Sequence, residues 1–111
     1  MRKAECLVAA RTAARYGGEG FAVILPDHGL ADSLAVAERI RMAIASRRVV
    51  NRSRNQTLGT ITLSIGAAQF VPGETPSAFI ERADRGLYAA KRTGRNRVVA
   101  DNDIRASESD D

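Results

Sequence analysis

The chain has 111 residues, of which 44% are apolar, and a formal net charge of +4. This length is enough for one small domain and not for two, and the apolar content excludes a disordered chain. The sequence contains no run of about 18 apolar residues, so we expect no membrane-spanning helix. Cys6 is the single cysteine, which excludes an internal disulfide and favours a cytoplasmic location.

Charge is unevenly distributed along the chain. Residues 101–111 hold five of the 13 acidic residues and one of the 17 basic ones, so residues 1–100 carry 16 basic and 8 acidic groups. A basic body suits an anionic partner such as a nucleotide or nucleic acid, but it also suits an ordinary solvated surface. Residues 101–111 are polar and lack an apolar period, and we expect them to form a disordered acidic tail.

The first predicted elements form a hairpin. Residues 21–25 (FAVIL) are apolar and bounded by glycine and proline, which predicts a buried strand, and residues 12–16 are a weaker strand candidate. Gly17 and Gly18 lie between these two runs. Because glycine adopts positive φ without a Cβ clash, the segment 17–20 predicts a tight turn between the strands.

A helix, a loop and a strand are predicted next. Residues 30–47 show apolar residues at helical spacing, and Asp27 or Asp32 is the expected N-cap. Residues 51–59 are polar and predict a loop. Residues 60–68 alternate apolar with small or polar residues, which predicts a strand with one apolar and one polar face.

A second helix is predicted at residues 76–93, with Thr75 as its N-cap and Gly94 at its end. We expect Tyr88 of this helix to face the core. Residues 98–99 predict a last short strand. The whole order predicts an α/β or α+β sandwich, with a mainly antiparallel sheet and helices packed on it.

Two places could carry chemistry. Gly17 and Gly18 expose backbone N–H groups that can approach a phosphate, and Glu19 beside them could hold a divalent cation, although an ordinary hairpin with one surface acid explains the same residues. Lys91 and Arg95 lie where the second helix ends. They could bind phosphate, or they could serve only to stabilise the negative end of the helix dipole.

Three motifs in this sequence resemble those of GGDEF domains, the domains of diguanylate cyclases. RYGGEGF at residues 15–21 resembles the signature RYGG(D/E)EF, and TLSIG at 62–66 resembles the family strand TxSIG. ADRGLYAAK at 83–91 and GRNRV at 94–98 resemble the end of the family domain. The resemblance covers residues 15–99 and identifies residues 1–100 as a partial GGDEF domain.

The resemblance implies a function. The family condenses two GTP molecules into cyclic di-GMP and pyrophosphate, each subunit of an antiparallel homodimer presenting one GTP, with Mg²⁺ or Mn²⁺ assisting phosphoryl transfer. By this resemblance Glu19 is a metal ligand and the candidate catalytic base. Gly17 and Gly18 form the turn against the phosphates, and Lys91 and Arg95 contact them.

The chain also departs from the family pattern. Gly20 stands where the signature has a second carboxylate, so the signature is degenerate. The residues before the signature contain no Asp or Asn, whereas the family has there a strand with an Asp metal ligand and the residues that read guanine. Asp27 cannot replace that ligand beside Glu19, because eight strand residues span roughly 25 Å.

We therefore expect an N-terminally truncated domain in which a missing central strand leaves unpaired strand edges and exposed apolar surface. The leading hypothesis is a diguanylate cyclase relative with weak or no activity. A second is a non-catalytic module that binds GTP or a partner protein. A third, a basic nucleic-acid binder, is disfavoured because the sequence has no aromatic-rich RNA-binding strand and no recognition-helix signature.

Overall fold

The structure is a computed structural model that describes residues 4–13, 18–46, 48–51 and 56–102. Its elements are, in chain order, β1 (Glu5–Ala13), β2 (Gly20–Pro26), α1 (Leu30–Ala45), β3 (Arg48–Asn51), β4 (Gln56–Thr60), β5 (Thr62–Gln69), α2 (Pro76–Arg92) and β6 (Val98–Ala100). Of the predicted site residues, Gly17 lies outside the described residues.

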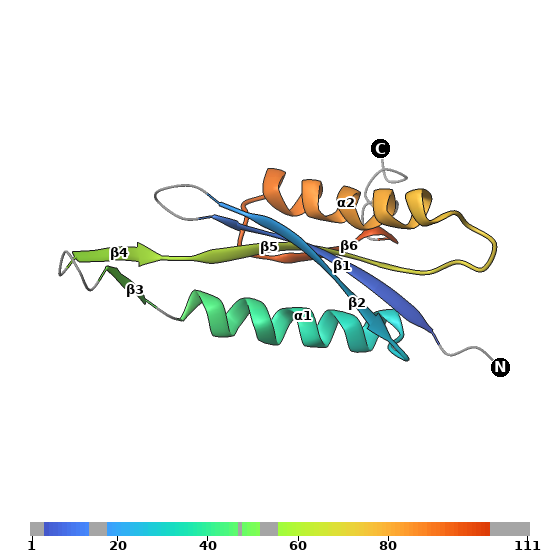
Figure 1. Cartoon of the computed structure of the whole chain (residues 1–111), viewed down its shortest axis with the longest axis horizontal. Coiled ribbons are helices and arrows are strands. Elements are labelled where there is room, and N and C mark those ends of the chain that lie inside the picture. The colour runs from blue at the N-terminus through green and yellow to red at the C-terminus, as the bar shows by residue number, and fades with distance from the viewer. Residues whose placement is uncertain (1–3, 14–17, 47, 52–55, 103–111) are drawn as a thin grey trace.

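The main sheet has the strand order β2-β1-β5-β6. β1 pairs antiparallel with both β2 and β5, while β5 and β6 run parallel. The helices α1 and α2 cover opposite faces of this sheet, and β3 and β4 form a separate hairpin (Figure 1). The predicted α+β sandwich with a mainly antiparallel sheet is confirmed.

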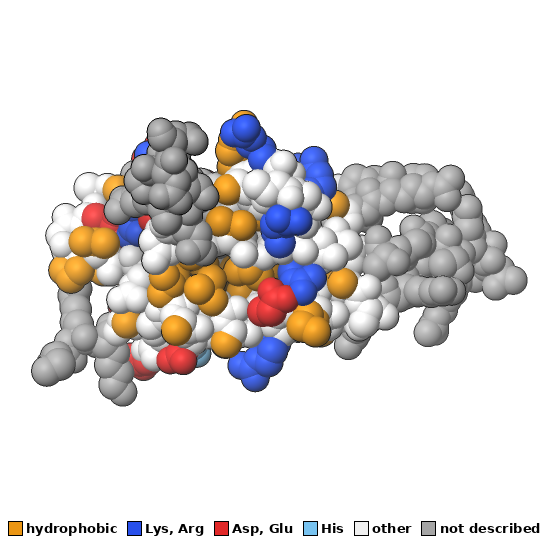
Figure 2. Space-filling model, turned by 180° about the vertical axis from the view of Figure 1, so that it is seen from behind, with side chains coloured by type: hydrophobic (Ala, Val, Ile, Leu, Met, Phe, Trp, Pro, Cys, Tyr) orange, Lys and Arg blue, Asp and Glu red, His pale blue; other side chains and the backbone are white. Residues whose placement is uncertain are grey.

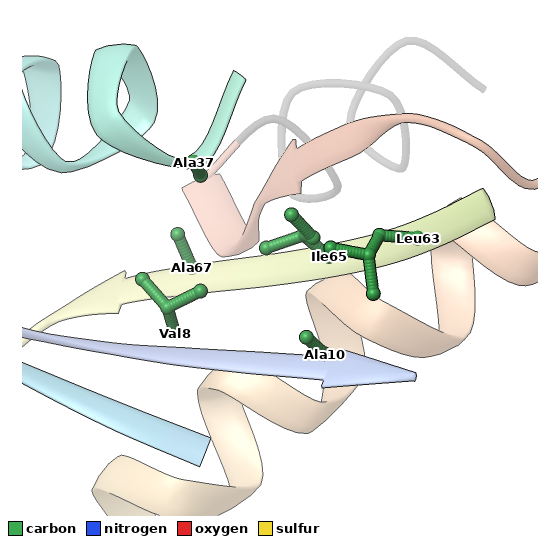
Figure 3. Packing of buried hydrophobic residues seen from close by; sticks show 6 residues of the cluster. All are labelled: Val8, Ala10, Ala37, Leu63, Ile65 and Ala67. Atoms are coloured by element: carbon green, nitrogen blue, oxygen red, sulfur yellow. The ribbon is translucent and has the colours of Figure 1, made fainter. Parts of the chain in front are cut away.

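The sheet is buried on both faces because each face carries a helix. Alternate residues of the central strands point to opposite sides, so Val8 and Ile65 pack under α1 while Leu7 and Ala68 pack under α2. Figure 3 shows the α1 side, where Ala37 of α1 faces the sheet residues. The expectation that β5 has one polar face is wrong, since Leu63 to Ala68 are all buried.

Two glycines bring α2 close to the sheet. A Cβ added to Gly66 of β5 would lie 2.0 Å from the backbone N of Leu87, and one added to Gly86 of α2 would lie 2.6 Å from the carbonyl O of Val99. Real side chains do not tolerate such distances. The glycine in the TLSIG motif is therefore required by the packing of helix on strand.

The helix ends agree only in part with the predictions. Thr75 caps α2 as expected, because its Oγ1 accepts a hydrogen bond from the N–H of Ala78 at 3.1 Å. The prediction for α1 is wrong, since its N-cap is Gly29 with no side-chain cap. Instead Gln69 of β5 accepts the N–H of Leu30 through its Oε1 at 2.9 Å, a contact between residues 39 positions apart.

Two segments were assigned wrongly from sequence. The first strand begins at Glu5 and not at residue 12, and Gly20 belongs to β2 and not to the turn. In the predicted loop at 51–59, Asn51 belongs to β3 and residues 56–59 belong to β4, while residues 52–55 lie outside the described residues. In both cases the local residues are poor strand formers, and pairing with a neighbouring strand decides the conformation.

Two single residues also differ from expectation. Tyr88 is 61% exposed on the outer side of α2 and does not join the core. Asp101, expected at the start of the disordered tail, is buried and ion-paired with Arg82. The rest of that predicted tail, from residue 103 on, lies outside the described residues.

The expected gap in the sheet is not found among the described strands. β1 lies between β2 and β5 and pairs with both along its length. The expected exposed apolar surface is present, however, and it lies on the edge strand β2, where Phe21, Val23 and Ile24 are all exposed. The prediction that residues 21–25 form a strand is confirmed, but the prediction that this strand is buried is wrong, because β2 lies at the edge of the main sheet.

Candidate functional site

Glu19 lies at the point where the β1–β2 hairpin begins its second strand. Two hydrogen bonds join its backbone to Thr12. The N–H of Thr12 donates to the carbonyl O of Glu19, and the N–H of Glu19 donates to Oγ1 of Thr12, each at 2.8 Å. A Cβ on Gly18 would lie 1.9 Å from the carbonyl O of Thr12, so only glycine fits there. Glu19 is exposed and free to meet a ligand.

The second half of the site is the turn that follows α2. Gly94, Arg95 and Asn96 have φ values of 131°, 61° and 46°, so three successive residues lie at positive φ. The N–H of Arg95 donates to the carbonyl O of Ala90 at 2.8 Å. The turn thus folds back on the last turn of α2, which carries Lys91, and the two predicted phosphate contacts share one end of the helix.

Side chains from two other elements hold this turn. Ser64 of β5 accepts the N–H of Asn96 through its Oγ at 3.2 Å. Arg41 of α1 donates from Nη1 to Oδ1 of Asn96 at 2.9 Å. Arg41 is itself held by a hydrogen-bonded ion pair with Glu38. The hydrogen bond from Arg41 lowers the pKa of Glu38, which keeps that carboxylate ionised.

The hairpin that carries Glu19 and the turn that carries Arg95 lie at the same end of the sheet, but β1 and β5 lie between β2 and this turn. Gly20 is opposite Arg11, Arg11 is opposite Ser64, and Ser64 binds Asn96. Two steps at about 4.8 Å between neighbouring strands separate Gly20 from Ser64 by roughly 10 Å, and the hydrogen bond between Ser64 and Asn96 adds a further step. A ligand that reached both Glu19 and Arg95 would have to span β1 and β5.

The end of α2 is strongly cationic. Lys91, Arg92, Arg95 and Arg97 lie within seven residues, and within the described part of the chain the ion pairs use only Arg41 and Arg82. Figure 2 shows basic side chains gathered on the side where α2 ends, with few acidic ones among them. Unpaired cations on a preformed turn are suited to an anionic ligand.

The residues described do not form a metal centre of their own. Among them no group of three or more His, Cys, Asp or Glu side chains could hold a metal ion. Within the described part of the hairpin, Glu19 is the only carboxylate at its end of β2, since Asp27 follows the opposite end of that strand. Mg²⁺ needs near-ideal octahedral oxygen ligation, and one exposed carboxylate does not provide it. We therefore assign no chemical step to a metal ion.

Sequence reasoning missed the residues that position the site. Thr12, Ser64, Arg41 and Asn96 were not predicted to take part. Ser64 carries a weak signal, because it is a hydroxyl between the apolar residues Leu63 and Ile65. Asn96 carries another, because asparagine adopts the left-handed region more readily than most residues. Nothing in the sequence linked Arg41 to a turn 55 residues away.

Comparison with known proteins identifies the class of domain. The profile described as "Diguanylate cyclase, GGDEF domain" matches residues 2–97, and the chain belongs to this family. It is 49% identical over 86 residues to the response regulator PleD of Caulobacter vibrioides, and 43% identical over 88 residues to the diguanylate cyclase VdcA of Vibrio cholerae. These matches cover 77% and 79% of this chain but 19% and 26% of the relatives.

Solved structures agree with this assignment. The GGDEF domain of DgcB from Caulobacter crescentus, solved in complex with c-di-GMP, has a TM-score of 0.80 and 34% identity, over 89% of this chain and 76% of that one. The diguanylate cyclase SiaD from Pseudomonas aeruginosa, in complex with its activator SiaC, has a TM-score of 0.75 and 25% identity, over 88% and 50%. Neither helix of the described residues has the length and apolarity needed to cross a membrane.

Proposed function

We propose that this GGDEF domain binds GTP through Lys91 and Arg95 and converts it to cyclic di-GMP slowly or not at all. One observation carries the proposal: the turn bearing Arg95 is held at positive φ by Ser64 and Arg41, and its neighbouring cations form no ion pair within the described part of the chain. Non-glycine residues at positive φ are uncommon, and they persist where the surrounding structure holds them, often at ligand sites.

Phosphate recognition fits the chemistry of these two residues. Arg95 offers a planar fork of N–H donors that can grip two phosphate oxygens, while Lys91 supplies a compact point charge. Gly18 and Glu19 lie at the same end of the sheet, and the exposed Gly18 backbone could approach a phosphate without steric hindrance. Gly17, the other glycine that we predict at the phosphates, belongs to the same proposal.

Slow turnover is expected because few carboxylates are present in the described part of the site to bind a divalent metal ion. Phosphoryl transfer between two nucleotides depends on divalent metal to neutralise the developing charge. Among the described residues of β2 and its hairpin, Glu19 is the only acid at this end of the strand, and position 20 of the degenerate signature lacks a side chain. This loss also favours the second candidate function, a regulatory module that holds GTP without turnover.

The test separates binding from turnover. We expect isothermal titration to show GTP binding that weakens about 10- to 100-fold in Lys91→Ala or Arg95→Ala, because a charge-assisted hydrogen bond contributes about 1.5–3 kcal/mol. Arg85→Ala is the matched control, since Arg85 is also an exposed cation on α2. Equal weakening in the control, or no GTP binding by the native chain, would contradict the proposal.

Turnover is measured on the same proteins with GTP and Mg²⁺ or Mn²⁺. Chromatography should detect little or no cyclic di-GMP, and Glu19→Ala should abolish any product while leaving the melting temperature unchanged, because Glu19 is exposed. Rapid turnover by the native chain would refute the expectation of weak activity. Product that survived Glu19→Ala would refute the role given to Glu19.

A further inference from the structure

β2 forms an open edge of the main sheet. It is the first strand in the order β2-β1-β5-β6, and among the described strands it pairs only with β1. In Figure 1 it passes in front of the other strands, with its outer side facing the viewer. The opposite edge is β6, which has only three residues. Among the described strands of the main sheet, β2 is therefore the one long strand with an unpaired edge.

The backbone groups on that edge can be assigned from the ladder. The carbonyl O of Glu5 accepts the N–H of Phe70, so the odd-numbered residues of β1 face β5 and the even-numbered ones face β2. Val8 and Ala10 are opposite Val23 and Phe21, which therefore point their backbone groups inward. It follows that the N–H and C=O groups of Ala22 and Ile24 point outward and have no partner in the sheet.

Apart from the proline at its last position, β2 lacks the features by which proteins usually prevent edge pairing. Its sequence, GFAVILP, contains no charged residue, its register with β1 has no bulge, and its proline stands at the last position. Phe21, Val23 and Ile24 are 49%, 44% and 59% exposed. Phe21 and Val23 also line an apolar groove of about 50 Å³ beside Ile40 of α1. An apolar strand with free backbone groups is a template for another strand.

We propose that β2 pairs antiparallel with β2 of a second copy of this chain, about a two-fold axis at Val23. In this register Ala22 lies opposite Ile24 of the second copy and Ile24 opposite Ala22, so the outward groups hydrogen-bond each other. Gly20 lies opposite Pro26, which has no N–H and takes part in this pairing only by accepting a hydrogen bond through its carbonyl O. The positive φ of Asp27, 63°, turns the chain away directly after the paired segment.

The strand favours a second copy over other occupants because it is complementary to itself. The two-fold axis places Phe21 beside Leu25 and Val23 beside Val23 on the α1 side of the sheet, and Ala22 beside Ile24 on the α2 side. Every pair is apolar on apolar, which stabilises antiparallel strands. Because the contact uses the same edge of both copies, it closes into a dimer and does not propagate into a fibre.

Cysteine trapping tests the register directly. Val23 at the axis forms a pair without hydrogen bonds, with Cα atoms about 4.5 Å apart, which is within disulfide range. We expect Val23→Cys to form a covalent dimer under mild oxidation. Val71→Cys is the matched control, since Val71 is 53% exposed and follows β5, which does not pair with β2. The native Cys6 does not compete, because it is fully buried.

Analytical ultracentrifugation of the native chain is the second test, because it measures whether the chain is a monomer or a dimer. We expect a reversible dimer that becomes a monomer in Ile24→Lys, with an unchanged melting curve at low concentration, while Val71→Lys remains dimeric. A native chain that stays monomeric at all accessible concentrations would overturn the proposal. A dimer that persists in Ile24→Lys, or that Val23→Cys fails to trap, would assign the interface elsewhere. No nucleotide is present, so the result is independent of GTP binding.

Discussion

At the scale of single residues, the turn after α2 holds two non-glycine residues in an unfavourable backbone conformation. Arg95 and Asn96 both lie in the left-handed region, which costs L-residues of order 1 kcal/mol each. Hydrogen bonds from three elements compensate: Ser64 of β5, Arg41 of α1 and the carbonyl of Ala90 in α2 all bind this turn. The orientation of Arg95 is therefore set by residues that need not touch a ligand.

We predict that Arg41→Ala loosens this turn. The substitution removes the hydrogen bond to Asn96 and leaves Glu38 without its partner, and we expect a loss of about 1–2 kcal/mol in the free energy of unfolding. Amide hydrogen exchange of residues 94–97 should become faster, and GTP affinity, if the proposed function holds, should fall. Arg39→Ala serves as control, because Arg39 is an exposed residue of the same helix. Unchanged exchange at 94–97 would show that Arg41 does not hold the turn.

At the scale of elements, the contact between α2 and β5 depends on the absence of side chains. Gly66 and Gly86 face each other, and a Cβ on Gly86 would lie 3.0 Å from the Cα of Gly66. The cluster of Leu7, Ala9, Ala68, Phe79 and Ala83 packs around this contact. This close approach fixes α2 against β5 at Gly86, five residues before Lys91.

We predict that Gly66→Ala is strongly destabilising, by about 3 kcal/mol or more, because the added methyl meets helix backbone that cannot move aside. Gly20→Ala is the matched control. Its Cβ would lie 3.7 Å from the nearest atoms, an ordinary contact, so we expect it to be neutral or slightly stabilising. Urea unfolding of both variants measures the difference. Equal stability would mean that α2 does not pack on β5 this closely.

At the scale of the whole molecule, one arginine ties together three separate parts of the chain. Arg82 of α2 forms ion pairs with Glu74, before the helix, at 2.5 Å and with Asp101, after β6, at 3.1 Å. It also donates to the carbonyl O of Gln69 at 2.6 Å and lies 5.9 Å from the centre of the Phe79 ring. The hydrogen bond to Arg82 lowers the pKa of Glu74 below its ordinary value of 4.5.

This cluster predicts how stability depends on pH. Since the pKa of Glu74 is lower in the folded chain than in the unfolded one, its contribution is fully present above pH 4.5 and is lost as the pH falls through the folded value. We expect the melting temperature to drop on acidification below pH 4.5, and to drop less steeply in Glu74→Gln. Glu81→Gln, an exposed residue of α2, is the control. Parallel pH profiles for native chain and Glu74→Gln would contradict the prediction.

The sequence by itself determined what depends on local residues and short spacings. The apolar run of β2, the Thr75 cap and the apolar stripes of both helices follow from patterns within a few positions, and the three motifs were enough to recognise the GGDEF family. Lys91 and Arg95 could also be placed at the end of α2 from their order in the chain.

Only the tertiary structure decided what depends on distant neighbours. Three of the nine residues of β1 are alanine, a poor strand former, and β1 is a strand because β2 and β5 supply hydrogen bonds on both sides. The cap of α1 comes from Gln69, the support of Asn96 from Arg41, and the burial of Asp101 from Arg82. These contacts join residues at least 19 positions apart, and they form only when folding brings the two ends of each contact together.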